Sequence, residues 1–475
     1  MPDEAPGMQA LDIGAEFPPV STEAWEAVIA KDLKGADYEK KLVWRLEDGI
    51  AVRPYYRGED LAGLKDQLQA GPGQFPFVRG DVEPWQTAEA PPFAAIRADL
   101  LHEAGATAVQ ELGFALAEAV DRLAQAPEGG AAKAAGEIDF VFAIGPYYLL
   151  EIAKFRAARM LWAQAVAAFG VQDDGACRMR LYARTSRRNK SVYDRYTNLL
   201  RVTTEALSAA VGGCDQVYVE PFGFDQHLAL GVQRILREES RIDAVADPAG
   251  GSYTFEALTD ALAREAWALL QKVEAEGGYA QALKSGSIEQ AIAQSRASRQ
   301  KAAASRRVTL VGVNNYPDVK ETGTEVKPPA PEASPFGAAR LAEPFEAVRQ
   351  RTERHTLKTG RRPKVLLLKR GDVKMRGARA NFSLNFLGCA GFDIADSDTY
   401  EGADADLIVL CSSDPEYLAL AQEVCPAVKV PVLVAGNPKD QIDALKAAGV
   451  QGFIYMGADA IQTFTQWQDR LGMEK

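Results

Sequence analysis

Short, continuously apolar runs alternate with segments of helical spacing along most of the chain. In the first half, the apolar runs lie at 93–100, 138–144, 179–183 and 216–221, and helical spacing covers 108–123, 149–168 and 198–211. Later, five apolar runs lie at 364–368, 392–395, 407–411, 430–435 and 452–456, with a last helical segment at 459–471. Apolar runs of this length predict strands buried on both faces of a parallel sheet, connected by helices. We therefore expect an α/β protein.

This pattern changes along the chain and predicts four regions. Residues 1–50 form an N-terminal arm with one helix, and residues 51–310 carry four strand–helix units followed by trailing helices. Residues 311–362 form a Pro-rich linker, with six prolines between 317 and 344, which predicts an extended, semi-rigid segment. Residues 363–475 form a second α/β domain. Four strand–helix units are too few to close an eight-stranded barrel.

Composition excludes several classes of function. The net charge of −11 disfavours nucleic acid as a partner. The five cysteines are scattered without a Cys-x-x-Cys pair, so we interpret them as small buried residues in a reducing compartment. The first residues are acidic and lack the apolar core of a signal peptide, and no apolar run approaches the roughly 18 residues of a membrane helix. We expect a cytoplasmic protein that binds neither nucleic acid nor membrane.

The stretch 371–377, G-D-V-K-M-R-G, lies between the predicted strand 364–368 and a helical segment over 378–388. We expect a loop at the C-terminal end of a strand, where open α/β sheets bind ligands. It lacks the glycine spacing of phosphate-binding loops. The stretch resembles the Asp-x-His-x-x-Gly loop of the adenosylcobalamin-dependent mutases, chiefly the methylmalonyl-CoA mutase family.

Other motifs resemble the same family over nearly the whole chain. They are H-E-A-G-A at 102–106, E-I-A-K-F-R-A-A-R at 151–159 and D-P-A-G-G-S-Y at 247–253. The resemblance implies a truncated (β/α) TIM-barrel-like domain over 51–310 and a degenerate, flavodoxin-like cobalamin-binding-type domain over 363–475. It also implies that the arm 1–50 wraps a partner subunit.

The cobalamin loop departs from the family pattern at its metal ligand. Asp372 and Gly377 match, but Lys374 stands where the family has the His that reaches the cobalt. A protonated lysine amine has no lone pair for a metal, whereas neutral imidazole has one.

Two further cobalamin motifs are also altered. Ser412 matches the first residue of the family's Ser-x-Leu motif, but Asp414 replaces the leucine. Gly436 matches the first residue of its Gly-Gly pair, but Asn437 replaces the second glycine. We therefore interpret Asp372, Lys374, Gly377, Ser412 and Gly436 as vestigial positions, and expect no cofactor and no metal in this chain.

The barrel region departs from catalytic members at three motifs. Asp99 and Leu100 stand where the resemblance places a Tyr-His pair, and Arg184 begins R-T-S-R-R where catalytic members have Q-T-S-G-W. Glu220 lies in V-E-P-F, where they have a His-Thr-Asn run. His102 fits the pattern of the family's small subunits. We therefore expect no catalytic residues.

The resemblance implies a non-catalytic small subunit that stabilises a homologous large mutase subunit in a heterodimer. Adenosylcobalamin and acyl-CoA would then bind to the partner, which interconverts methylmalonyl-CoA and succinyl-CoA. The alternatives are a working cobalamin mutase, another acyl-CoA mutase component, and an unrelated enzyme or a small-molecule or anion-binding protein on the same scaffold.

The half-barrel and its basic segment leave further alternatives open. We expect an apolar inner face that a partner covers, and self-association of the isolated chain. Segment 178–201 holds eight basic residues against one acid, Asp194. It could bind the phosphates of CoA or a carboxylate, pair with an acidic partner surface, or remain a solvated loop.

Overall fold

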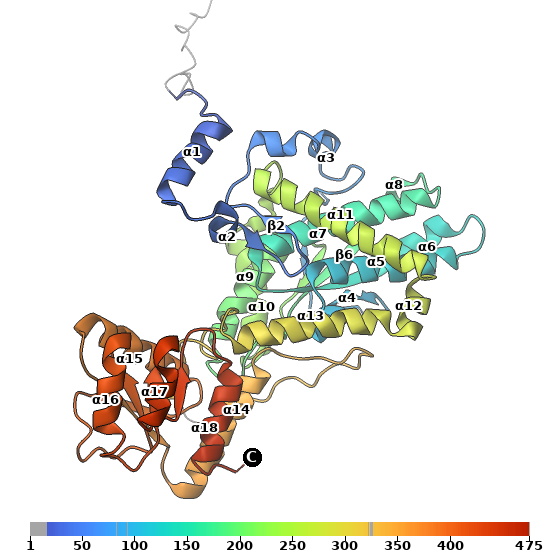
Figure 1. Ribbon diagram of the computed structural model, residues 1–475. Coiled ribbons are helices and arrows are strands. Elements are labelled where there is room, and N and C mark those ends of the chain that lie inside the picture. Colours follow the sequence, from blue (N-terminus) through green and yellow to red (C-terminus); the bar gives the residue numbers. More distant parts are fainter. Residues whose placement is uncertain (1–16, 82, 93, 322, 324–325, 475) are drawn as a thin grey trace, which may run out of the picture. The chain divides into compact units, whose positions relative to one another are not determined.

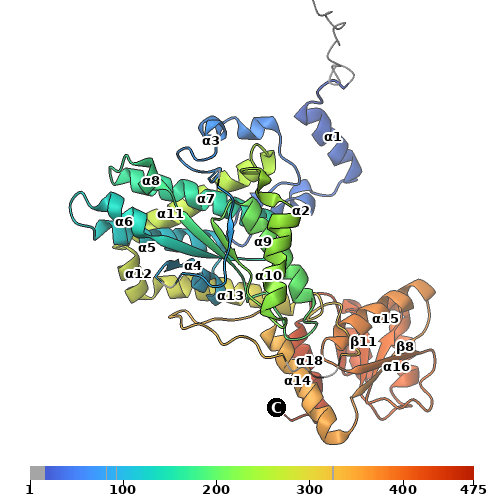
Figure 2. The ribbon, with the colours of Figure 1, turned by 180° about the vertical axis from the view of Figure 1, so that it is seen from behind.

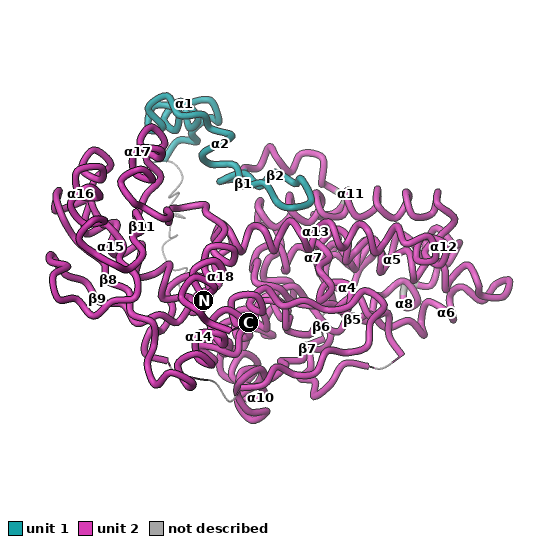
Figure 3. The backbone as a smooth tube through the Cα atoms, turned by 60° about the horizontal axis from the view of Figure 1, so that its bottom comes forward, with its two compact units in different colours: residues 1–56 teal, residues 57–475 magenta. Residues whose placement is uncertain are grey.

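The computed structural model describes residues 17–81, 83–92, 94–321, 323 and 326–474, and the chain divides into two compact units, residues 1–56 and 57–475 (Figure 3). In the first unit, α1 (Thr22–Asp32) begins after Ser21, whose side chain accepts a hydrogen bond from the Ala24 amide. It is followed by α2 (Tyr38–Leu42) and by the antiparallel pair β1 (Trp44–Arg45) and β2 (Ala51–Val52). The first 16 residues of the predicted arm lie outside the described residues.

The second unit begins with a parallel sheet whose strand order is β3-β7-β6-β5-β4. Its strands are β3 (Gln86–Thr87), β4 (Ile96–Arg97), β5 (Asp139–Ile144), β6 (Arg180–Thr185) and β7 (Gln216–Tyr218). Four of them match predicted strands, whereas β3 was not predicted. The predicted strand 93–100 shortens to β4 because α4 (Ala98–Ala104) begins directly after it, and residue 93 lies outside the described residues.

Helices cover one face of this sheet. Phe140 and Phe142 of β5 pack edge-on against Trp162 and Phe155 of α7, with ring centroids 5.0 and 6.4 Å apart. Helix α11 packs across α5 and α7 (Figure 1). The helices of this region are α3 (Lys65–Gln69), α5 (Ala108–Ala124), α6 (Ala131–Glu137), α7 (Tyr148–Ala168), α8 (Asp174–Cys177), α9 (Thr197–Val211), α10 (Gln226–Arg234), α11 (Tyr253–Ala275), α12 (Tyr279–Ser285) and α13 (Ser287–Ala304).

The opposite face of the sheet is more polar than expected. Strand alternation and register place on it the side chains of Arg97, Val141, Tyr182, Arg184 and Tyr218. Val141 is buried, but both tyrosines are partly exposed. The prediction of an apolar inner face is therefore wrong, because it extrapolated from β5 to neighbouring strands that carry arginine and tyrosine at the matching positions.

The second sheet is parallel and has the order β12-β11-β10-β8-β9. Its strands are β8 (Lys364–Lys369), β9 (Asp393–Ser397), β10 (Leu407–Cys411), β11 (Val432–Ala435) and β12 (Gly452–Ile454). Its helices are α15 (Val373–Gly388), α16 (Tyr417–Val424), α17 (Ile442–Ala447) and α18 (Ala460–Arg470) (Figure 2). Val365 and Leu367 join one apolar cluster and Leu366 and Leu368 another, so both faces of β8 are covered.

The predicted linker 311–362 is extended only in part, because α14 (Glu343–Thr359) occupies its C-terminal third. Phe345 and Val348 of this helix join the same apolar cluster as Trp467 of α18. Gln468 Nε2 also donates to Val348 O at 2.6 Å and to Thr352 Oγ1 at 2.9 Å. These apolar contacts and hydrogen bonds hold α14 against α18. The prolines of the segment concealed the helical spacing of α14 in the sequence.

The cysteines are all free; Cys177, Cys214, Cys389 and Cys411 are buried and Cys425 is partly buried. Among the described residues, no cluster of three or more His, Cys, Asp or Glu side chains could hold a metal ion. In the same part of the chain, every helix is too short or too polar to span a membrane.

Candidate functional site

Three residues that depart from the catalytic pattern meet at the C-terminal ends of the first sheet. Arg184 lies near the end of β6, Asp99 just after β4 and Glu220 just after β7. Arg184 Nη1 lies 2.9 Å from Asp99 Oδ2, and Arg184 Nε lies 3.2 Å from Glu220 Oε2. Asp99 is fully buried and Arg184 is 2% exposed, so the charges are matched away from water. In parallel α/β folds this end of the sheet carries the chemistry.

A further carboxylate reaches this site from a distant part of the chain. We call residues 326–342 the strap, and Glu332 within it contacts three guanidinium groups. Its Oε2 lies 2.5 Å from Arg97 Nη2, and its Oε1 lies 2.5 Å from Arg184 Nη1 and 3.5 Å from Arg187 Nη2. Burial alone would raise the pKa of Glu332, but the charge of Arg184, helped by Arg97, lowers it.

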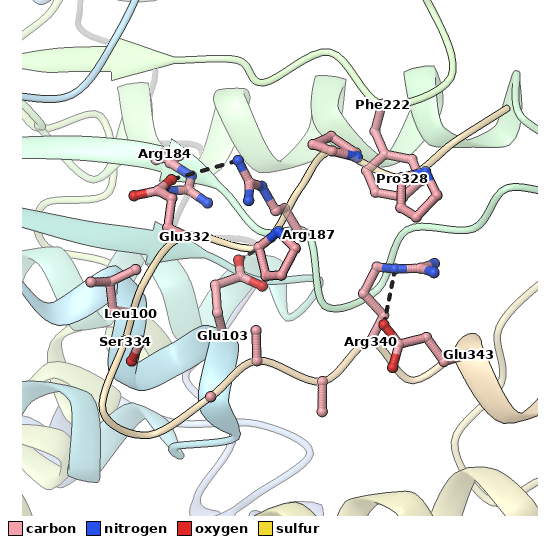
Figure 4. A pocket seen from close by; sticks show the side chains of 15 residues that line it. Leu100, Glu103, Arg184, Arg187, Phe222, Pro328, Glu332, Ser334, Arg340 and Glu343 are labelled. Atoms are coloured by element: carbon pink, nitrogen blue, oxygen red, sulfur yellow. Dashed lines mark hydrogen bonds and ion pairs between the residues drawn. The ribbon is translucent and has the colours of Figure 1, made fainter.

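A cavity of about 120 Å³ lies beneath the strap. Figure 4 shows Arg184, Arg187 and Glu332 gathered on one side of it and Arg340 with Glu343 on the other. Its apolar lining comes from Leu100, Phe222, Pro328, Pro329 and Pro331.

Glu103 lines the same cavity and has a strongly shifted pKa. Burial raises the pKa of Glu103 to about 7, against the opposing effects of the Arg184 charge and the Arg187 amide. Arg187 N donates to its Oε1 at 2.8 Å. Among the described residues, nothing donates a hydrogen bond to the other oxygen of this carboxyl group.

A second buried network lies at the edge of β5. Beyond the end of β4, Glu111 Oε1 accepts from Ala143 N at 2.8 Å, and Lys154 Nζ donates to Ala143 O at 2.7 Å. Lys154 also pairs with Glu111 at 2.8 Å and with Glu151 at 2.6 Å. These charges therefore satisfy strand backbone groups that the short β4 leaves unpaired.

His102 connects this network to Ser186 in the order of a nucleophilic triad. Its Nε2 lies 3.0 Å from Ser186 Oγ, and its Nδ1 lies 3.3 Å from Glu111 Oε2. Burial, followed by the charge of Lys154, lowers the pKa of His102 to about 3, so the imidazole is neutral. However, Ser186 is 1% exposed and accepts from Arg188 N, so no substrate reaches its hydroxyl group. The triad-like contact is therefore structural.

The basic segment 178–201 is paired within the chain. Lys190 is buried, and its Nζ lies 2.7 Å from Glu205 Oε1. Arg188 donates to two backbone carbonyls, those of His102 and Ala106. Arg178 pairs with Asp81, and the Arg184 pairs are described above. Of the three alternatives, the solvated loop does not describe Arg184, Arg188 and Lys190, because these side chains are buried and bind acids and carbonyls of the same chain. Arg178 and Arg195 are exposed.

In the second sheet, the stretch 371–377 is mostly helical. Helix α15 begins at Val373 because the Asp372 side chain accepts from Met375 N at 2.8 Å and caps it. Lys374 is therefore an exposed residue of the first helical turn, and Gly377 also lies within the helix. The prediction of a loop throughout 371–377 is wrong, because it overlooked Asp372 as a helix cap.

The side-chain carboxylate of Glu416 lies at the C-terminal ends of β8 and β10. Glu416 Oε2 accepts hydrogen bonds from Asp372 N at 3.2 Å, Ser413 N at 3.2 Å, Ser412 Oγ at 2.8 Å and Ser413 Oγ at 2.5 Å. The Ser413 and Ser412 hydroxyls, with the two amides, lower the pKa of Glu416 to about 2. A Cβ added at Gly371 would lie 2.2 Å from Glu416, so the contact is as close as glycine allows.

The neighbouring position, Gly436, is covered as well. Arg379 Nη2 pairs with Asp414 Oδ1 at 2.9 Å, and a Cβ at Gly436 would lie 3.4 Å from Arg379 and from Tyr417. Tyr417 is fully buried and donates to Ala435 O at 2.6 Å. The five vestigial positions thus lie around the ends of β8, β10 and β11, but the donor set does not fit cobalamin. Lys374 points no lone pair at a metal, and Glu416 and Arg379 lie at these strand ends.

The apolar and motif patterns of the sequence did not indicate Glu332 and Glu416, the two carboxylates that lie at these strand ends. Glu416 had a local signal, because S-D-P-E at 413–416 is a capping box and the structure forms both of its hydrogen bonds. Glu332 had only a weak signal, as the one acid between residues 326 and 342. Its partner Arg184 lies 148 positions away in the sequence, so only the fold brings them together.

The fold and site define an α/β protein with two parallel sheets, in which buried ion pairs occupy one sheet's strand ends and Glu416 those of the other. The family profile described as methylmalonyl-CoA mutase matches residues 81–360. The chain belongs to the methylmalonyl-CoA mutase family.

Individual relatives agree with this assignment. The methylmalonyl-CoA mutase small subunit of Porphyromonas gingivalis is 32% identical over an alignment of 618 residues, covering 97% of this chain and 98% of the relative. The small subunit of Streptomyces virginiae is 36% identical, covering 81% of this chain and 65% of the relative. A methylmalonyl-CoA mutase of Cereibacter sphaeroides is 38% identical, covering 52% of this chain and 37% of the relative.

The first of these alignments is 618 residues long, whereas this chain has 475, so well over a hundred positions of the relative have no counterpart here.

Proposed function

We propose that the chain is the non-catalytic small subunit of an adenosylcobalamin-dependent methylmalonyl-CoA mutase. The observation that carries the proposal is the ion-pair network of Asp99, Arg184 and Glu220, with Glu332 as its fourth member. Asp99, Arg184 and Glu220 stand at the motifs where the chain departs from catalytic members, and their buried charges neutralise one another. The similarity to proteins named small subunits supports the same conclusion.

In this proposal, cobalamin and acyl-CoA bind to a homologous large subunit, which interconverts methylmalonyl-CoA and succinyl-CoA. The cofactor supplies radical chemistry there, and this chain contributes none. The absence of a cobalamin site here is supported by Glu416 at the ends of β8 and β10, by the Arg379–Asp414 pair beside Gly436 and by Lys374 on a helix. The five free cysteines accord with a reducing cytoplasm.

For the architecture, we propose that residues 51–310 are a truncated TIM-barrel-like domain and residues 363–475 a degenerate, flavodoxin-like cobalamin-binding-type domain. Numbered along the chain, the second sheet has the order 5-4-3-1-2, the order of flavodoxin-like sheets. The arm 1–50 and the connecting segment 311–362 complete the chain, and α14 of that segment packs with the second domain.

The subunit would act by stabilising the large subunit in a heterodimer. The first sheet supports this because β3 and β4 lie at its two edges, and unpaired parallel edges favour association. The half-exposed tyrosines Tyr182 and Tyr218 on its inner face offer aromatic contacts to a partner.

Co-expression of this chain with a tagged large subunit from the same genome tests the proposal. We expect a stoichiometric complex by light scattering and a higher thermal midpoint for the large subunit. In equilibrium dialysis with adenosylcobalamin, we expect bound cofactor only in samples that contain the large subunit. Failure to associate, or mutase turnover by this chain alone, would refute the proposal.

The alternative is a protein that binds a small anion on the same scaffold. It is favoured by one observation, the convergence of Arg97, Arg184 and Arg187 beside a cavity. Association with the large subunit decides between the two functions, because a stand-alone binding protein does not require it.

A further inference from the structure

Glu332 contacts its partners as a bound carboxylate would. One oxygen faces Arg97 and the other faces both Arg184 and Arg187, so the three guanidinium groups, which we call the arginine cluster, surround a single carboxylate. This arrangement is the usual geometry of carboxylate recognition by arginine. Glu332 belongs to the strap, whereas the arginines belong to β4, β6 and the segment after β6.

The local charges show what would remain without Glu332. The arginine cluster carries three positive charges, and its fixed acidic partners are Asp99 and Glu220. Below about pH 7, where Glu103 is protonated, Glu332 brings the total to zero. Withdrawal of its side chain leaves one uncompensated positive charge among groups that are largely shielded from water, and an unpaired charge there is unfavourable. The vacancy therefore matches one monoanion.

The surroundings of Glu332 limit the size of that anion. The cavity of about 120 Å³ adjoins the arginine cluster and also has an apolar wall formed by Leu100, Phe222 and Pro328. Such a volume holds a few waters or the short tail of a small acid. The Glu332 side chain is 35% exposed, so its site opens to solvent at one side.

Several hydrogen bonds attach the strap to the rest of the chain, among them one from Arg296 Nη1 to Phe336 O at 3.2 Å. Ala339 N donates to Glu103 O at 3.1 Å and Leu341 N to Arg188 O at 2.9 Å, which anchor its C-terminal part. Arg187 Nη1 donates to Ala330 O at 2.9 Å. The residues between Ala330 and Ala339 form no helix or strand. Release of Glu332 thus requires the loss of few backbone hydrogen bonds.

We propose that the arginine cluster is a binding site for a small monocarboxylate, and that Glu332 occupies it as a tethered competitor. A carboxylate with a short apolar tail displaces Glu332 and places its tail in the cavity beneath the strap. This site lies outside the cobalamin and acyl-CoA chemistry proposed for the large subunit, and it does not depend on the heterodimer.

Acetate and butyrate serve as probes of this site, with binding measured by isothermal titration calorimetry. A tethered side chain competes at an effective concentration of roughly millimolar. Glu332→Ala removes that competitor, so we expect its acetate Kd to be at least about ten-fold lower than that of the wild-type chain. Butyrate should bind more tightly than acetate because its tail reaches the apolar wall.

Two variants complete the experiment. Glu343→Ala is the matched control, because Glu343 lines the same cavity but pairs with Arg340 instead of the arginine cluster. We expect it to bind acetate as the wild-type chain does. The double variant Glu332→Ala/Arg187→Gln should lose the increase in acetate affinity that Glu332→Ala alone produces. Equal Kd values in all four proteins, or a gain that survives loss of Arg187, would overturn the proposal.

A second measurement needs no variant. A Glu-specific protease cleaves after Glu332 only when the arginine cluster releases this residue. We expect sodium butyrate to accelerate cleavage of the Glu332–Ala333 bond relative to sodium chloride at equal ionic strength. An unchanged rate at saturating butyrate would overturn the proposal, even if Glu332→Ala fails to fold.

Discussion

Because of Glu103, the free energy of unfolding of the chain should decrease as the pH rises. This residue is 5% exposed, and burial raises the pKa of Glu103 from 4.5 to about 7. The folded chain therefore binds a proton between about pH 4.5 and pH 7 that the unfolded chain has released. The stabilising contribution of protonated Glu103 is complete below the pKa that this residue has in the unfolded chain. It is lost as the pH rises through the pKa that Glu103 has in the folded chain.

The size of the effect follows from the pKa difference. Each pKa unit corresponds to about 1.4 kcal/mol, so a rise from 4.5 to about 7 corresponds to about 3 kcal/mol. Glu103→Gln keeps a carbonyl oxygen for the Arg187 amide, which donates to Glu103 Oε1 at 2.8 Å. The substitution therefore removes the titration while retaining this hydrogen bond.

Urea unfolding of the wild-type chain and Glu103→Gln, from about pH 5 to about pH 8, measures this contribution. We expect the wild-type free energy of unfolding to fall relative to the variant as the pH rises, by about 3 kcal/mol at most. Glu343→Gln is the control, because Glu343 lines the same cavity with a side chain that is 52% exposed. Parallel curves for the wild-type chain and Glu103→Gln would refute the reasoning.

Substitutions at three further positions test other parts of the structure. Glu111→Ala should cost about 3–5 kcal/mol in urea unfolding because it removes one of the two carboxylates that pair with buried Lys154 and leaves Ala143 N without its acceptor. Glu111→Gln should cost less, and equal losses would contradict this account. Phe345→Ala should cost about 3–5 kcal/mol, since α14 packs in the second domain; a loss below about 1 kcal/mol would place α14 outside that core. Lys374→His alone should not create cobalamin binding in equilibrium dialysis. Micromolar binding would show that the ends of β8, β10 and β11 can accept the cofactor.

Much of the fold followed from the sequence because buried parallel strands have an unambiguous pattern. Strand β10 (Leu407–Cys411) matches its predicted range, and β5 differs from its range by one residue. The errors lie where a local signal competes with the pattern. Asp372 starts α15 earlier than its apolar spacing suggests, and the prolines before α14 concealed a helix. Strand β3 is only two residues long, too short to produce a detectable pattern.

The site was less predictable than the fold. The sequence marked Asp99, Arg184 and Glu220 as departures from the catalytic pattern, and the structure brings these three together. It did not indicate that they pair with one another, because pairing depends on three strand ends that are distant in the sequence. Glu332 was missed for the same reason.

Both parallel sheets use a carboxylate of the chain where parallel α/β folds bind ligands. Glu332 neutralises guanidinium groups in one, and Glu416 accepts amide and hydroxyl hydrogen bonds in the other. Parallel strands direct donors to the same edge whether or not a ligand binds, and each buried donor left unpaired costs about 1–3 kcal/mol. An acidic residue of the chain satisfies those donors here, Glu332 in the first sheet and Glu416 in the second.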